Sequence, residues 1–125
     1  MLRLLLATSA LLVTLSDAAV AAGSYSTGNV NPTAGASSVT ITISHAVTQQ
    51  NLDQTCQVYL NGNLLTAACI TSITLVPGET SKFTVTFNTT GTPPIWGPLV
   101  ATDVILVTGR TDTEGTATVD DIVWA

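Results

Sequence analysis

Charged residues are scarce in this sequence. Only 9% of its 125 residues are charged, against about 25% in an ordinary soluble domain. Three basic and eight acidic residues give a net charge of −5. Beyond residue 22 the basic residues are Lys82 and Arg110, too few for the phosphate-neutralising patch that nucleic-acid binding requires. We therefore expect no nucleic-acid partner.

Histidine and cysteine are equally rare, with one His and two Cys. These numbers exclude a zinc site built from several His and Cys ligands. His45 continues the alternation of Ile43 in a predicted strand, which favours a half-buried structural role. No nucleophile–base arrangement and no phosphate-binding glycine motif accompany it. We therefore predict that the protein is not an enzyme and uses no cofactor.

Hydroxyl side chains take the place of charge, with 23 Thr and 9 Ser. The hydrophobic content of 46% is enough to form a core and argues against disorder. The length suits a single domain. We expect a surface covered by hydroxyl groups rather than by ions.

Residues 1–22 are apolar apart from Arg3, Asp17 and small hydroxyls. In one interpretation they are a signal peptide, with Leu4–Leu15 as its hydrophobic region and cleavage after Ala22. In the other they are retained as a hydrophobic helix of about 33 Å, long enough to cross a bilayer or line a filament core. Both interpretations place the rest of the chain outside the cell. The side chains that would drive assembly of a retained helix are Leu4, Leu5, Leu6, Leu11, Leu12, Val13 and Leu15.

The remaining chain divides into two parts. Residues 23–38 are rich in Gly, Ser and Asn, which indicates a linker, an irregular strand or a strand donated to a neighbouring subunit. Residues 39–125 alternate apolar and polar side chains without a helical period. They predict a mainly β head, an immunoglobulin-like antiparallel β-sandwich of about seven strands. Within it, 100–108 and 116–124 are expected to form a long hairpin.

Two predicted strands depart from simple alternation. Residues 104–107 are apolar on both faces, which suits a central strand covered on both sides or a strand buried by a neighbouring subunit. In the last strand, Ala117 and Val119 have the opposite parity to Ile122 and Trp124. A bulge at residues 120–121 would restore a single apolar face.

The two cysteines lie in the segment CQVYLNGNLLTAAC, which has the pattern of a hairpin. A type II′ turn at Gly62-Asn63 would place Cys56 directly opposite Cys69, at a spacing that a disulfide can bridge. We therefore predict a cross-strand disulfide, typical of an extracellular compartment. The alternative is a pair of reduced, buried cysteines.

Three further features concern ligands. The acidic residues of one ten-residue segment suggest either a calcium site or a solvated turn and bulge; they are Asp112, Glu114, Asp120 and Asp121. Asn88-Thr89-Thr90 is an N-glycosylation sequon. Trp96, in a proline-rich loop, could stack on a sugar or close one end of the sandwich.

Two motifs accompany the apolar segment and the Thr/Ser-rich head: Tyr59-Leu60-Asn61-Gly62 and the turn LVPGET at 75–80. With these, residues 38–88 and the N-terminal segment resemble archaeal type IV pilins and archaellins. The resemblance implies that apolar helices pack as a filament core and that heads, often glycosylated, form the outer shell. It implies identical subunits as partners and a membrane during assembly.

Two functions are expected from these observations. The first is a structural, pilin-like subunit of an extracellular filament that assembles through its N-terminal segment with the head outward. The alternative is a secreted adhesion or carbohydrate-binding module with a cleaved signal peptide, for which Trp96 and the acidic hairpin would provide the contacts. Both place the protein outside the cell or at its surface.

Overall fold

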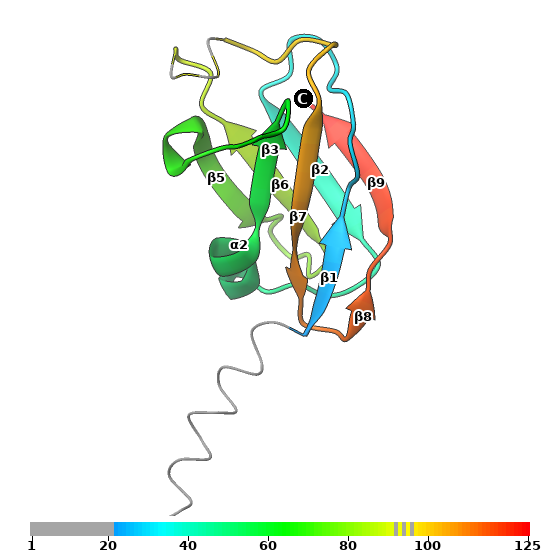
Figure 1. Ribbon diagram of the computed structural model, residues 1–125. Helices are drawn as coiled ribbons and strands as arrows, with labels where there is room; N and C mark the ends of the chain where they lie inside the picture. The colour runs from blue at the N-terminus through cyan, green and yellow to red at the C-terminus, as the bar shows by residue number, and fades with distance from the viewer. Residues whose placement is uncertain (1–21, 92, 94, 96) are drawn as a thin grey trace, which may run out of the picture.

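A computed structural model describes residues 22–91, 93, 95 and 97–125, and in this part the chain forms two β-sheets (Figure 1). Sheet A contains β1 (Gly23–Ser26), β3 (Gln57–Leu60), β4 (Asn63–Leu64), β7 (Ile105–Thr111) and β8 (Gly115–Thr116). Sheet B contains β2 (Ser38–Ile43), β5 (Ile70–Leu75), β6 (Lys82–Phe87) and β9 (Val119–Trp124). The strand orders are β4-β3-β7-β1-β8 and β5-β6-β2-β9. The prediction of a mainly β head is confirmed.

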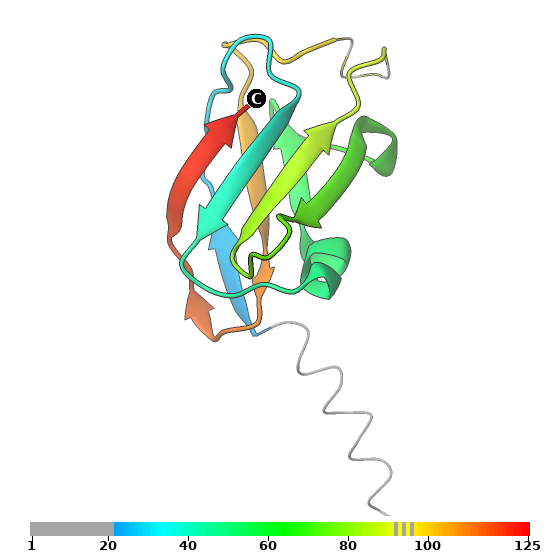
Figure 2. The ribbon, with the colours of Figure 1, turned by 180° about the vertical axis from the view of Figure 1, so that it is seen from behind.

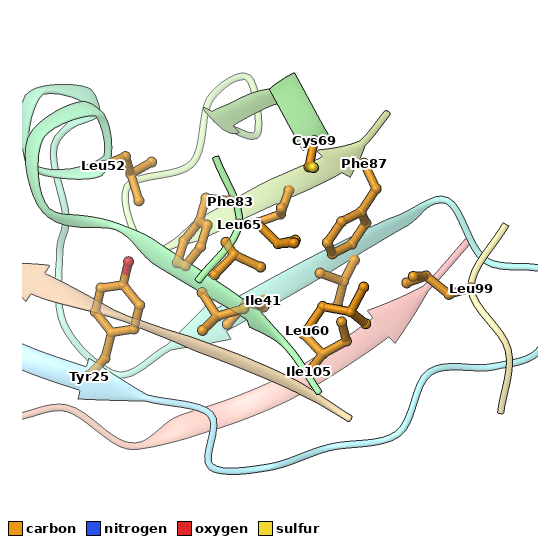
Figure 3. Close-up of a cluster of buried hydrophobic side chains, with 14 of the residues drawn as sticks. Tyr25, Ile41, Leu52, Leu60, Leu65, Cys69, Phe83, Phe87, Leu99 and Ile105 are labelled. Atoms are coloured by element: carbon orange, nitrogen blue, oxygen red, sulfur yellow. The ribbon is translucent and has the colours of Figure 1, made fainter. Parts of the chain in front are cut away.

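The core lies between the two sheets, and Figure 3 shows apolar side chains from both meeting there. Buried and half-buried positions alternate along β2 and β6, as the period-2 pattern predicts. Ile41 and Phe83 from sheet B and Ile105 from sheet A are fully buried. Each such side chain contributes about 1.5–3 kcal/mol by leaving water, so the alternation fixes which face of each sheet turns inward.

The predicted bulge in the last strand is confirmed. Thr42 of β2 pairs with Asp121, but the next residue, Ile43, pairs with Val119, so Asp120 is the extra residue of β9. Because of this insertion the apolar residues on both sides of the bulge pack against the core, namely Val119, Ile122 and Trp124.

Strand β7 is central in sheet A, between β3 and β1. Ile105 and Val107 point into the core, whereas Leu106 is half-buried on the outer face. Leu106 pairs with Tyr59, which pairs in turn with Leu64. The apolar outer side of β7 therefore belongs to a short apolar row across sheet A.

One prediction about the connection of strands is wrong. Residues 100–108 and 116–124 do not form a hairpin, because β7 lies in sheet A and β9 in sheet B. The chain crosses between the sheets through β8, which pairs parallel to β1. In the segment expected to be a linker or a strand, Gly23–Ser26 form β1, which pairs with β7 of the same chain.

The alternation also gave no sign of helix α2 (Gln49–Thr55). Thr48 begins it, and its side chain accepts a hydrogen bond from the backbone N–H of Asn51 at 3.1 Å. Leu52 is its one buried apolar side chain. A helix of two turns with one apolar contact has no detectable period.

Candidate functional site

The predicted disulfide between Cys56 and Cys69 is wrong, and both cysteines are free. The turn is formed by Asn61 and Gly62, with φ of 51° and 86°, so Leu60 rather than Asn61 begins the ladder. These angles define the type I′ turn that Asn-Gly favours. This register shifts Cys69 out of line with Cys56.

Beyond Leu65 the chain leaves the ladder and forms a short 3-10 helix, η2 (Ala67–Cys69). Cys69 is buried there, and its Sγ donates to the backbone oxygen of Pro93 at 3.4 Å. Cys56 lies instead at the end of α2, half-buried, where its N–H donates to the oxygen of Leu52 at 3.2 Å.

The Cys56 thiol lies near the hydroxyl of Tyr25. Tyr25 pairs with Gly109 in sheet A, and Gln57, the residue after Cys56, pairs with Thr108 on the other side of the same strand. Tyr25 and Cys56 therefore flank Gly109. Burial raises the pKa of Cys56 from 9.0 to about 11, against a smaller lowering effect of the Tyr25 hydroxyl. Burial likewise raises the pKa of Tyr25, with Cys56 adding to the shift.

Tyr25 Oη has no hydrogen-bond partner of good geometry among the described residues. Its interaction with the thiol is therefore weak. A buried thiol with a raised pKa is a poor nucleophile. The burial of both groups therefore favours a packing role for this pair.

A side groove of about 470 Å³ opens between the sheets next to this pair. It is walled by α2, β3, β4 and β5, with Leu52, Val58 and Ile73 among its apolar lining. Asp53 is its charged lining residue, and one of its oxygens accepts from Gln49 Nε2 at 2.9 Å. All of its lining residues lie between Leu52 and Ile73, and sequence reasoning missed the groove because the strand pattern gave no sign of α2, which forms one wall.

The structure does not bring the four acidic residues of the suggested calcium site together. Asp112 Oδ1 accepts from Asn51 Nδ2 at 2.6 Å, and Asp120 Oδ1 accepts from Thr118 Oγ1 at 3.0 Å. Among the described residues, no three His, Cys, Asp or Glu side chains converge to hold a metal ion. Asp112 and Asp120 therefore accept separate hydrogen bonds from different side chains.

The sequon lies directly after β6. Asn88 Oδ1 accepts from the backbone N–H and the hydroxyl of Thr90, at 3.2 and 2.5 Å. Asn88 Nδ2 donates to the oxygen of Ala68 at 2.9 Å. Asn88 is half-exposed, so its amide lies at the surface of a turn.

The remaining residues singled out in the sequence are His45, Trp96 and the apolar side chains of the N-terminal segment. His45 is half-buried, as predicted, and its Nδ1 has no hydrogen-bond partner within the described part of the chain. Trp96 lies outside the described residues. So do the apolar side chains of the N-terminal segment, Leu4, Leu5, Leu6, Leu11, Leu12, Val13 and Leu15.

The outer side of sheet B is formed mostly by small hydroxyl side chains, and we call it the hydroxyl face; Figure 2 shows its four strands side by side. Thr40 and Thr84 pair across β2 and β6, and their hydroxyls are 2.8 Å apart. Among the residues paired across the four strands, those that point outward are Ser38, Thr40, Thr42, Ser72, Thr74, Lys82, Thr84, Thr86, Asp121 and Val123. The prediction of outward-facing threonines is confirmed for β2 and β6.

The free edges of sheet B are protected against further strands. At β5, the Gln49 side chain donates to the oxygen of Ile73 at 2.7 Å and accepts from the N–H of Leu75 at 3.0 Å. At β9, Asp121 Oδ1 accepts from the N–H of Ile122 at 3.0 Å, directly beside the bulge. Side-chain caps and bulges of this kind discourage edge-to-edge pairing.

The edges of sheet A, β4 and β8, are only two residues long each. A strand this short offers too few backbone groups to pair with another chain. Copies of this head therefore have little opportunity to join by extending either sheet.

Comparison with models of protein families, with curated proteins and with solved structures finds no match to this chain. Within the described residues, no helix is long and apolar enough to span a membrane. The function is therefore inferred from the geometry of the head and from the sequence that precedes it.

Proposed function

We propose that this protein is a structural, pilin-like subunit of an extracellular filament, which assembles through residues 1–22 with its β head outward. The observation that carries the proposal is the place of β1, the strand that follows the apolar segment. It lies inside sheet A, paired with β7 on one side and β8 on the other. The apolar segment is thus joined to the interior of the fold rather than to a loop.

This connection suits a subunit under tension. The N–H of Ala22 donates to Thr111 O at 3.0 Å, and Arg110 Nε donates to Gly23 O at 2.6 Å. A force applied along residues 1–22 acts along β1 and loads its hydrogen bonds together instead of one at a time. The C-terminus and the loop after β6 lie at the opposite end of the head (Figure 1), away from this junction.

We also infer that the head is a variant of the immunoglobulin-like sandwich. In the immunoglobulin nomenclature, the order β5-β6-β2 corresponds to D-E-B and the order β3-β7 corresponds to C-F. The variation lies in the first and last strands. Here the first strand lies beside β7 and the last beside β2, the reverse of the immunoglobulin arrangement.

Asn88 is proposed as a glycan acceptor on this head. Its amide lies in a turn, and the hydroxyl of the sequon residue Thr90 bonds its side-chain oxygen. Mass spectrometry of the natural protein before and after removal of N-glycans tests this. An unmodified Asn88 would contradict it.

The experiment for the main proposal compares the full chain with residues 22–125, by light scattering and negative-stain electron microscopy. The full chain should form filaments, and the truncated chain should not. N-terminal sequencing of the natural protein should give a start near Met1. A start at Gly23, together with a natural protein that does not polymerise, would instead support a secreted adhesion or carbohydrate-binding module.

A further inference from the structure

The hydroxyl face carries two charged side chains in one row. Lys82 on β6 pairs with Thr42 on β2, and Thr42 pairs with Asp121 on β9. Neighbouring strands are about 4.8 Å apart, so the charges lie about equally far from Thr42 on either side. Lys82 is the only lysine of a chain whose net charge is −5, and it lies across β2 from Asp121 and from the exposed bulge residue Asp120.

The same face also carries an exposed apolar side chain. Val123 is 52% exposed and lies in the next row, where Thr84, Thr40 and Val123 follow one another across β6, β2 and β9. Because most of its side chains are small hydroxyls, with one valine, the surface is nearly flat. Such a surface can approach another sheet closely without burying a large unpaired charge.

We propose that two copies of this chain pack through their hydroxyl faces, related by a twofold axis that runs along β2. This rotation exchanges the positions of β6 and β9 across the interface. Lys82 of one copy then faces Asp121 of the second copy, and the reverse pair forms on the other side of the axis. Thr42 faces its own equivalent, and Val123 faces the methyl group of Thr84.

A second copy is favoured as the occupant because the face is complementary to itself in charge. A twofold axis perpendicular to the strands would place Lys82 opposite Thr86 and leave both charges unpaired. Packing by the faces also agrees with the protected edges, since Gln49 and Asp121 cap backbone groups that strand pairing would need. With the axis along β2, the two copies of that strand run parallel across the interface, as aligned packing of sheets allows.

The first experiment tests proximity of Thr42 to its equivalent in the full chain. Facing sheets lie about 10 Å apart, so a bis-maleimide of comparable span should join Thr42→Cys to itself and give a covalent dimer. Ser26→Cys, exposed on sheet A, is the matched control and should give little dimer. The interface does not involve residues 1–22. If filaments form but Thr42→Cys gives no more dimer than Ser26→Cys, this inference fails and the filament proposal stands.

The second experiment tests the charge pairs with the Thr42→Cys chain. Lys82→Asp and Asp121→Lys should each lower the yield of dimer about tenfold at low salt, since two pairs become repulsive. The double exchange should restore it. Glu114→Lys, an equal change of charge in the turn before β8, should leave the yield near its original value. Failure of the double exchange to restore the dimer, or equal effects of Asp121→Lys and Glu114→Lys, overturns the inference.

Discussion

The ring of Tyr25 occupies the space that a side chain at Gly109 would need. The two residues pair between β1 and β7, and a Cβ at position 109 would lie 2.6 Å from Tyr25 Cζ. Glycine in a strand often marks such a close approach. It lets the tyrosine lie across β7 with its hydroxyl near Cys56.

Gly109→Ala should therefore destabilise the head by about 1–3 kcal/mol, because the tyrosine must leave a well-packed position. Urea unfolding followed by tryptophan fluorescence measures this. Gly97→Ala is the control, since a Cβ there meets open space, and it should be nearly neutral. In a Tyr25→Leu background, Gly109→Ala should lower the free energy of unfolding by less than it does in the original chain. An equal loss in the two backgrounds would contradict the contact.

Gln49 should matter more to the head than its exposed neighbour Gln50. Gln49→Ala removes two hydrogen bonds to the backbone of β5, worth about 1–3 kcal/mol together. It also uncovers an edge that can pair with another chain. Gln50→Ala should leave stability and association unchanged. Equal urea midpoints and equal light scattering for the two variants would show that Gln49 does not protect the edge.

The cysteines should titrate as free thiols. After denaturation without a reductant, a colorimetric thiol reagent should detect both Cys56 and Cys69. In the folded protein both should react slowly, because Cys69 is buried and the pKa of Cys56 is raised to about 11. Detection of no thiol in protein purified from an oxidising compartment would refute this cysteine arrangement.

Stability should fall at alkaline pH. The pKa of Cys56 is about 11 in the folded protein against 9.0 ordinarily, so the unfolded chain loses this proton first. The contribution of Cys56 to the free energy of unfolding is therefore complete below pH 9 and is lost between pH 9 and 11. Tyr25 acts in the same direction at higher pH. Urea unfolding at several pH values should show a shallower fall for Cys56→Ala, and an identical fall would contradict the assignment.

The regular strands were predictable because the polarity of each side chain indicates whether it lies on the inner or the outer face of the sheet. Val39, Ile41 and Ile43 alternate with hydroxyls, and the broken parity of the last strand located the bulge at Asp120. The cysteine pairing was not predictable in this way. The left-handed conformations of Asn61 and Gly62 decide the position of the turn. A shift of the turn by one residue changes the cross-strand partner of every residue beyond it.

The sequence by itself determined the mainly β class, the inward faces of β2 and β6, and the hydroxyl character of the outer surface. Each of these depends on the alternation of neighbouring side chains, which is a local property. Tertiary structure alone decided that β1 enters the middle of sheet A, that Tyr25 lies over Gly109, and that Lys82 and Asp121 share one row. Those relationships join residues 39–92 positions apart, and only the packing of the two sheets brings them together.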